Sequence, residues 1–309
     1  MYREMKIKNR YGGGWYLPVF VLLGAIMAAC SGSDEDFTDL FGQKLVLRAF
    51  SEKLSGEVSF ADSVFFAKGN ESGKYTDIWK ARVKEDGSTS LAEPKYYPSD
   101  NSRIYLRGFA PEGQLSGEGR IVYSIDGRQD LLVTDEQNGS LTDMFWQEGK
   151  SFRFTHLLSQ LRFQFRCDEA GKEKGWKLFG LVAEGVQCDA VLSLSDKGLT
   201  FSGEQKALIV LDRMAGGECL PLDTDWVDVS EMVMIQPGVA VGLTVILEDR
   251  AGNLTRFERL PVSFHETDGY PASGTSYLLS VVLRADGACS LSAQVSEWKR
   301  GNNGTGVID

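Results

Sequence analysis

Near its middle, the 309-residue chain reads Leu161-Arg162-Phe163-Gln164-Phe165-Arg166, in which apolar and polar side chains alternate. A period of two residues is that of a β-strand, so this segment predicts a strand with one apolar face and one solvated face. The same alternation recurs at residues 241–247, 277–283 and 291–295. These segments predict that β-structure dominates the second half of the chain.

Shorter apolar segments, separated by turn residues, continue this pattern on both sides. Turn signals such as Asp126-Gly127, Asn138-Gly139 and Pro237-Gly238 lie between them, and no window holds a long helical stripe. Many short strands joined by such turns predict an all-β sandwich rather than β-α-β units. The additional strands are expected at residues 45–50, 64–67, 78–83, 104–109, 121–123, 178–182, 208–211 and 232–235.

A domain boundary is expected between residues 137 and 150, where a polar stretch precedes a new strand beginning at Phe152. Each side is then long enough for a seven-stranded sandwich, which needs about 100 residues. The predicted division is an N-terminal β-sandwich at 44–149, a C-terminal β-sandwich at 150–300 and a polar tail at 301–309.

The N-terminus has the layout of a secretory signal peptide at residues 1–29: a basic start, an apolar run at 17–29 and small residues at its end. The run is shorter than the roughly 20 apolar residues of a membrane-spanning helix. Its end, Met27-Ala28-Ala29-Cys30, resembles the bacterial lipobox, which predicts acylation of Cys30 and attachment to a lipid bilayer. Ordinary cleavage near Ala29, which would leave a free thiol, is the alternative.

Residues 30–43 are expected to form an acidic tether. Its start, Ser31-Gly32-Ser33-Asp34-Glu35-Asp36, also resembles the surface-export signal of lipoproteins, although a plain linker explains it equally well. Without residues 1–29 the chain keeps 29 basic and 42 acidic residues, a net charge of −13. A surface this acidic repels phosphate backbones, which excludes nucleic acid as a partner.

The remaining cysteines show no C-x-x-C spacing, and the chain contains two histidines, His156 and His265, so a zinc site is not expected. Disulfides and unpaired buried thiols are both compatible with this spacing. The cysteines in question are Cys167, Cys188, Cys219 and Cys289.

Residues for catalysis are not apparent, and we predict neither an enzyme nor a cofactor or metal. No G-x-S-x-G motif is present, and His156 lies among apolar residues, which favours a core or turn position. Acidic pairs such as Asp223 and Asp225, or Glu266 and Asp268, are interpreted as solvated loop charges. Residues 249–253 lack the D-x-D-x-D-G series of a calcium loop and are interpreted as a hairpin turn.

Several motifs, in this order, resemble those of the fimbrillin family of lipoproteins. The first half contains Ile104-Tyr105-Leu106-Arg107-Gly108-Phe109-Ala110-Pro111, and the second begins with Phe154-Thr155-His156-Leu157-Leu158-Ser159-Gln160-Leu161. The end combines Gly274-Thr275-Ser276-Tyr277 with Val295-Ser296-Glu297-Trp298. The resemblance implies two tandem transthyretin-like β-sandwiches and a non-enzymatic subunit of a type V pilus-like fimbria at the outer membrane or cell surface.

The resemblance also implies assembly by strand exchange with other pilin subunits. In polymerising members a trypsin-like protease removes the first strand, and a strand of the next subunit fills the groove. Here the cut is expected between Arg48 and Ala49; an uncleaved edge strand, with Arg48 facing water, is the alternative. The polar tail is a poor donor strand, which favours a tip, anchor or minor subunit over the main stalk.

A surface glycan-binding lipoprotein is the second hypothesis, because exposed aromatic rings can stack on sugars. It requires at least two aromatic side chains aligned on an exposed face. The candidate rings, which would otherwise fill the core, are Trp79, Tyr96, Tyr97, Tyr105, Trp146, Trp176, Trp226 and Trp298.

Overall fold

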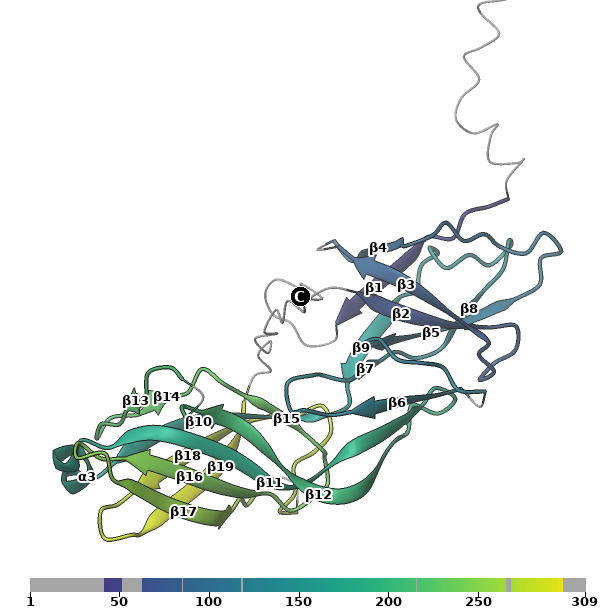
Figure 1. The fold of residues 1–309 in the computed structure, drawn as a ribbon. Helices are drawn as coiled ribbons and strands as arrows, with labels where there is room; N and C mark the ends of the chain where they lie inside the picture. The colour runs from purple at the N-terminus through teal and green to yellow at the C-terminus, as the bar shows by residue number, and fades with distance from the viewer. Residues whose placement is uncertain are drawn as a thin grey trace, which may run out of the picture. The chain divides into compact units, whose positions relative to one another are not determined.

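The computed structural model describes residues 42–51, 63–84, 86–117, 119–214, 216–264 and 268–296. β-strands dominate this part of the chain, which confirms the predicted all-β fold class (Figure 1). No helix within these residues has the length and apolar character needed to span a membrane.

Eight strands of the first half form one sheet, in the order β2-β3-β4-β1-β9-β7-β5-β8. Because β2 also pairs with β5, the sheet closes into a ring of seven strands, with β8 attached to β5. The strands are β1 (Leu47–Ser51), β2 (Val64–Gly69), β3 (Asp77–Val83), β4 (Ser88–Leu91), β5 (Ile104–Ala110), β7 (Leu132–Val133), β8 (Gln137–Gly139) and β9 (Phe152–His156).

Two further sheets, formed by β6 and by strands of the second half of the chain, have an apolar core between them. The five-stranded sheet has the order β14-β10-β18-β19, with β15 also paired to β10. The six-stranded sheet has the order β12-β11-β16-β17, with β13 and β6 also paired to β11. Their strands are β6 (Arg120–Ser124), β10 (Ser159–Cys167), β11 (Lys177–Ser193), β12 (Leu199–Asp212), β13 (Leu220–Pro221), β14 (Val227–Asp228), β15 (Val233–Ile235), β16 (Gly242–Glu248), β17 (Leu254–Pro261), β18 (Ser276–Leu283) and β19 (Cys289–Ser296).

Every strand predicted from alternation or an apolar run is present. The segment at residues 161–166 lies in β10, where Leu161, Phe163 and Phe165 face the core and the residues between them are partly exposed. The strands that the sequence did not predict are short or largely exposed, as in β17, where Phe257 is the one buried residue. A short six-residue helix, α3 (Glu169–Lys174), joins β10 to β11. Asp168 is its N-cap and Gly175 its left-handed C-cap.

Strand β2 explains why the described residues contain more than one core. Phe66 points into the ring, whereas Phe65 and Ala67 point outwards and are also buried. The outer cluster includes Ile121 of β6 and Leu192 of β11 as well. The first half is therefore covered on one outer side by residues of β6 and of the far end of β11.

Strand pairing does not change over at the expected boundary between residues 149 and 150. Strand β9 follows that boundary but pairs with β1 and β7 of the ring. Strand β6 precedes it but pairs with β11 of the six-stranded sheet. The described residues from Lys44 onwards form one compact unit, and the division into two sandwich domains stays a prediction.

Candidate assembly site

The first strand, β1, lies in the wall of the ring with one face in the core. Leu47 and Ala49 of β1 are buried, as is Leu45 just before it, whereas Val46 and Phe50 are exposed. With this alternation one face of the strand packs against the core and the other face lies in solvent. Complete burial of a leucine side chain contributes about 1.5–3 kcal/mol, so Leu47 of β1 and Leu45 before it are the main apolar anchors of this segment.

Backbone pairing holds β1 on both sides. Leu47 and Arg48 pair with β4 in antiparallel orientation, and Ala49 and Phe50 pair with β9 in parallel orientation. The Ala49 amide also donates a hydrogen bond of 2.9 Å to the Gly87 carbonyl. The strand is therefore an internal strand of the ring and not an edge strand, Arg48 faces solvent as that alternative expected, and cleavage after Arg48 stays a prediction.

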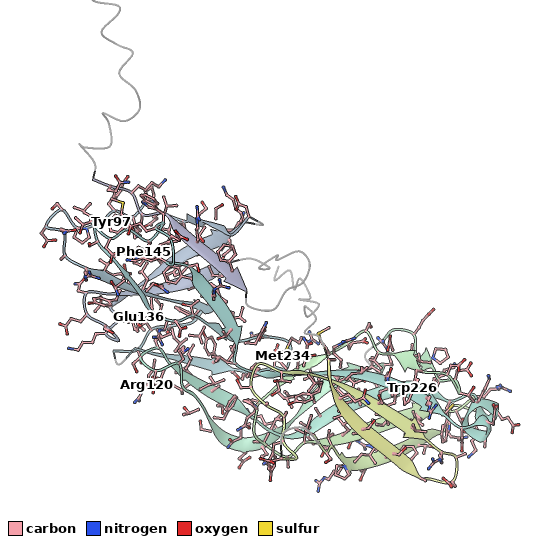
Figure 2. The ribbon with its side chains drawn as sticks, turned by 180° about the vertical axis from the view of Figure 1, so that it is seen from behind. Tyr97, Arg120, Glu136, Phe145, Trp226 and Met234 are labelled. Carbon is pink, nitrogen blue, oxygen red and sulfur yellow. The ribbon has the colours of Figure 1, made fainter. Side chains whose placement is uncertain are left out.

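Buried aromatic side chains form the apolar surface against which β1 packs, which we call the seat of β1. Phe152 of β9 meets Phe66 of β2 edge-on at 4.8 Å between ring centroids and lies 5.9 Å from Phe145. Tyr97 stacks on Phe145 at 6.1 Å, and both are labelled in Figure 2. The Phe145 amide donates a 2.7 Å hydrogen bond to the Tyr97 hydroxyl, whose pKa is raised by burial. Loss of β1 would expose this apolar seat and the backbone edges of β4 and β9 together.

The predicted processing residues lie on opposite faces of β1. The Arg48 side chain is exposed, as a protease recognition residue requires, while Ala49 is fully buried. Proteases act on chain that is released from its neighbours, and both flanks of this segment are paired. The arrangement presents the arginine to solvent but keeps the peptide bond after it inside a sheet.

The remaining N-terminal and C-terminal predictions fall outside the described residues. Cys30, the signal peptide at 1–29, most of the tether at 30–43 and the tail at 301–309 are among them. His265, Glu266 and Trp298 also lie outside the described part of the chain. Acylation of Cys30 and cleavage after Arg48 stay predictions.

The four cysteines within the described residues are unpaired. Cys167 and Cys188 are buried in the core of the second half, whereas Cys219 and Cys289 are half-buried. Burial raises the pKa of all four thiols, which keeps them protonated and weakly nucleophilic near neutral pH. Of the two alternatives that the sequence left open, the structure therefore has thiols rather than disulfides.

The polar groups considered for chemistry serve local structure. His156 Nδ1 lies 2.5 Å from Asp130 Oδ2, and burial raises the pKa of this carboxyl group. Asp223 pairs with Lys172 at 2.6 Å on the surface. Asp249 accepts hydrogen bonds from the Ala251 and Asn253 amides, which closes the turn between β16 and β17. The described residues contain no cluster of acidic, histidine or cysteine side chains suited to a metal ion.

Aromatic residues divide between core and surface. Trp79, Tyr97 and Trp176 are buried, whereas Tyr96, Trp146 and Trp226 are exposed. The guanidinium of Arg166 lies 4.6 Å from the centre of the Trp226 ring and covers one of its faces. A cation stacked in this way competes with a sugar for that ring face.

A carboxylate that the sequence analysis did not single out holds a turn of the ring. Glu136 accepts hydrogen bonds from the Ser72 hydroxyl at 2.6 Å, the Gly73 amide at 2.8 Å and the Tyr75 hydroxyl at 2.6 Å. Burial alone would raise its pKa, but these bonds outweigh burial and the net pKa is lowered. More than sixty residues separate the partners, so no local motif could have indicated this cluster.

Comparison with known proteins gives a family and a set of similar folds. The model of the fimbrillin-like family matches residues 61–298. No curated protein matches the sequence. A candidate cell adhesion protein of Bacteroides uniformis shares the fold with a TM-score of 0.57 at 17% identity, over 83% of this chain and 98% of that one.

Two further solved structures cover similar shares of the chain. A candidate cell adhesion protein of Bacteroides ovatus has a TM-score of 0.53 at 10% identity, over 84% of this chain and 98% of that one. The tip fimbrial protein Mfa3 of Porphyromonas gingivalis has a TM-score of 0.45 at 8% identity, over 83% of this chain and 99% of that one.

Proposed function

The chain belongs to the fimbrillin-like family, and from this premise we propose that it is a non-enzymatic, lipid-anchored subunit of a type V pilus-like fimbria that joins its neighbours by donor-strand exchange. Its partners would be other pilin subunits, and its place the outer membrane or the cell surface. Anchoring would depend on acylated Cys30, which needs no membrane-spanning segment.

The seat of β1 is the observation that carries this proposal. A strand held by alternating apolar side chains and by backbone bonds on both sides can be replaced by any strand with the same alternation. Its removal would leave buried Phe152 exposed and two rows of backbone groups unpaired, which is costly in water. A donor strand from a neighbouring subunit would satisfy both requirements at once.

Strand pairing supports the finer proposal of two tandem transthyretin-like sandwiches. In each half the first strand runs parallel to a strand near the end of that half. Strand β1 is parallel to β9, and β10 is parallel to β18. In both halves this first strand also has an antiparallel neighbour on its other side, β4 for β1 and β15 for β10. The same arrangement, used twice, is expected of a duplicated fold.

A tip, anchor or minor position is proposed from the C-terminal sequence. Residues 301–309 read Gly301-Asn302-Asn303-Gly304-Thr305-Gly306-Val307-Ile308-Asp309, with three glycines and few apolar side chains. A donor strand needs alternating apolar residues to fill the groove of the next subunit. This chain is therefore proposed to accept a strand more readily than to donate one.

Identification of the N-terminal residue of protein recovered from cells tests the proposal. Lipid-modified Cys30 is expected on unprocessed protein, and Ala49 on protein that has lost its first strand. Arg48→Gln should prevent the second product, whereas Arg153→Gln, which changes an exposed arginine on the neighbouring strand β9, should not.

Assembly is measured by mixing trimmed protein with untrimmed protein, or with a pilin from the same cells, and running unboiled samples on gels. Ladders of stable oligomers that require the trimmed form are expected. Monomers in every lane, together with an unmodified Cys30 in cells, would exclude both the anchor and the strand exchange.

A further inference from the structure

Strand β19 (Cys289–Ser296) forms one end of the five-stranded sheet. It pairs with β18 along its whole length without a register shift, from Ser276 with Ser296 to Leu283 with Cys289. Within the described residues no backbone hydrogen bond is made by its other edge. An open strand edge presents a row of unpaired amide and carbonyl groups that can pair with another chain.

The other long edge strands of the described residues carry features that prevent such pairing. Strand β12 contains Glu204 and Lys206, and its pairing with β11 is interrupted by three register shifts. Strand β17 contains three charged residues, ends at Pro261 and also has a register shift. Charges, proline and bulges are the usual protection of exposed edges. Strand β19 has no charged residue, no proline, no glycine and no shift.

The core-facing side of β19 is also incompletely covered. Val295 is 48% exposed, and Cys289 and Leu291 are half-buried although they point towards the core. An added strand with apolar residues on the same side would cover them. We propose that β19 docks a second copy of this chain through its own β19, so that one sheet continues across the two copies.

The sequence of β19 suits pairing with itself. In an antiparallel pair centred on Ser292, Leu291 lies opposite Ala293 of the second copy, and Cys289 lies opposite Val295 of the second copy. Ser290 likewise meets Gln294 of the second copy, so every apolar residue has an apolar partner on the same face. A shift by one residue would place apolar residues opposite polar ones. A two-fold axis midway between the two copies of Ser292 generates this arrangement from a single surface.

The absence of charge on β19 favours a second copy of the chain as the partner. The protein has a net charge of −10, yet the paired strands bring no charged side chains together.

Cysteine trapping tests the register directly. Cells producing the full chain with Cys219→Ser and Cys289→Ala, which removes the two half-buried thiols, would also carry Ser292→Cys and be treated with a mild oxidant. The two introduced cysteines would face each other, and a disulfide needs Cα atoms within about 7 Å. A dimer band on a non-reducing gel, at least tenfold above that of the background chain, is expected.

Gln294→Cys is the matched control. In the proposed register the two Gln294 positions are four residues out of line, roughly 13 Å along the strands, and should not be trapped. Cells that produce differently tagged Ser290→Cys and Gln294→Cys chains together should yield the mixed dimer. Equal trapping of Ser292→Cys and Gln294→Cys, absence of the Ser292→Cys dimer, or trapping of a protein of another mass would overturn the proposal. None of these outcomes depends on strand exchange at β1.

Discussion

Neighbouring residues of β1 have opposite environments, and this contrast was predictable from sequence. Leu47 is fully buried and Arg48 is exposed, as an alternating segment requires. The thiol state of the cysteines was not predictable, because wide spacings leave pairing open until distances are known. Contacts such as that of Glu136 with Ser72 depend on the whole fold and leave no local trace in the sequence.

Glu136→Gln should make stability less dependent on pH in acid. The pKa of Glu136 is lowered from its ordinary value of 4.5, so its carboxylate stabilises the fold above that pH. This stabilisation is lost as the pH falls through the lower pKa of the folded state. At neutral pH the substitution should cost about 1 kcal/mol, less than the roughly 1.5–3 kcal/mol of bonds to a charged group, because the carboxylate is partly exposed to solvent.

The measurement is urea unfolding of both proteins between pH 3 and pH 7. The two unfolding free energies should converge below about pH 4.5, since the wild-type carboxylate is then becoming protonated. Glu112→Gln removes the same charge from an exposed side chain and should leave the pH dependence unchanged. A constant difference between wild type and Glu136→Gln across the range would contradict the role of the charge.

At the scale of elements, strands were predictable where at least one face is buried. Strands β10 and β16 alternate in sequence because each has one face on a core, whereas β2 has both faces buried and is an apolar run. Strand β12 was predicted only at 208–211, because its central residues are exposed on both faces. The parallel pairing of β1 with β9 joins segments about one hundred residues apart, and alternation within a strand carries no information on its partner.

Opening of β1 should limit cleavage after Arg48. The peptide bond lies in a strand paired on both sides, so a protease reaches it only after local opening. Leu47→Ala should lower the free energy needed to release β1 from its seat by at least about 2 kcal/mol. Cleavage in trypsin should then become roughly 30-fold faster, since cleavage follows the population of the open form. The rate is followed by mass spectrometry of the product that begins at Ala49.

Two variants separate local opening from general loss of stability. Val46→Ala changes an exposed side chain directly before the first residue of β1 and should leave the rate unchanged. Leu161→Ala removes a buried side chain from the core of the second half and should destabilise the protein without faster cleavage after Arg48. If wild type and Leu47→Ala are cut equally fast, the bond is already accessible in the folded protein.

For the whole molecule, the contacts between the two halves of the chain were the least predictable feature. Two sandwiches divided near residue 150 follow from length and turn signals, but the pairing of β6 with β11 crosses that division. The Leu194 amide donates to the Gly119 carbonyl at 2.8 Å, and Lys197 pairs with Asp135 at 2.5 Å. These contacts arise because the long strand β11 extends beyond its own core, which no local pattern indicates.

Shared burial predicts that the described part of the chain unfolds as one unit. Ile121 of β6 is fully buried in the cluster that also contains Phe65 of the ring and Leu192 of β11. Tandem domains move and unfold independently unless the interface between them is large and apolar. Because this cluster is a core to both halves, neither half keeps its buried surface when the other unfolds. Calorimetry should therefore show one transition whose calorimetric and van't Hoff enthalpies agree.

Ile121→Ala tests this coupling, because it removes apolar volume from the shared cluster alone. A cost of about 2–5 kcal/mol should lower the single Tm by roughly 5–10 °C, whereas Val122→Ala, at a position 65% exposed, should shift it little. Two separate transitions, with Ile121→Ala moving one of them, would mean that the halves fold independently. In that case strand exchange at β1 would change the stability of the ring alone. If there is one transition, replacement of β1 must also change the stability of the half that contains β19.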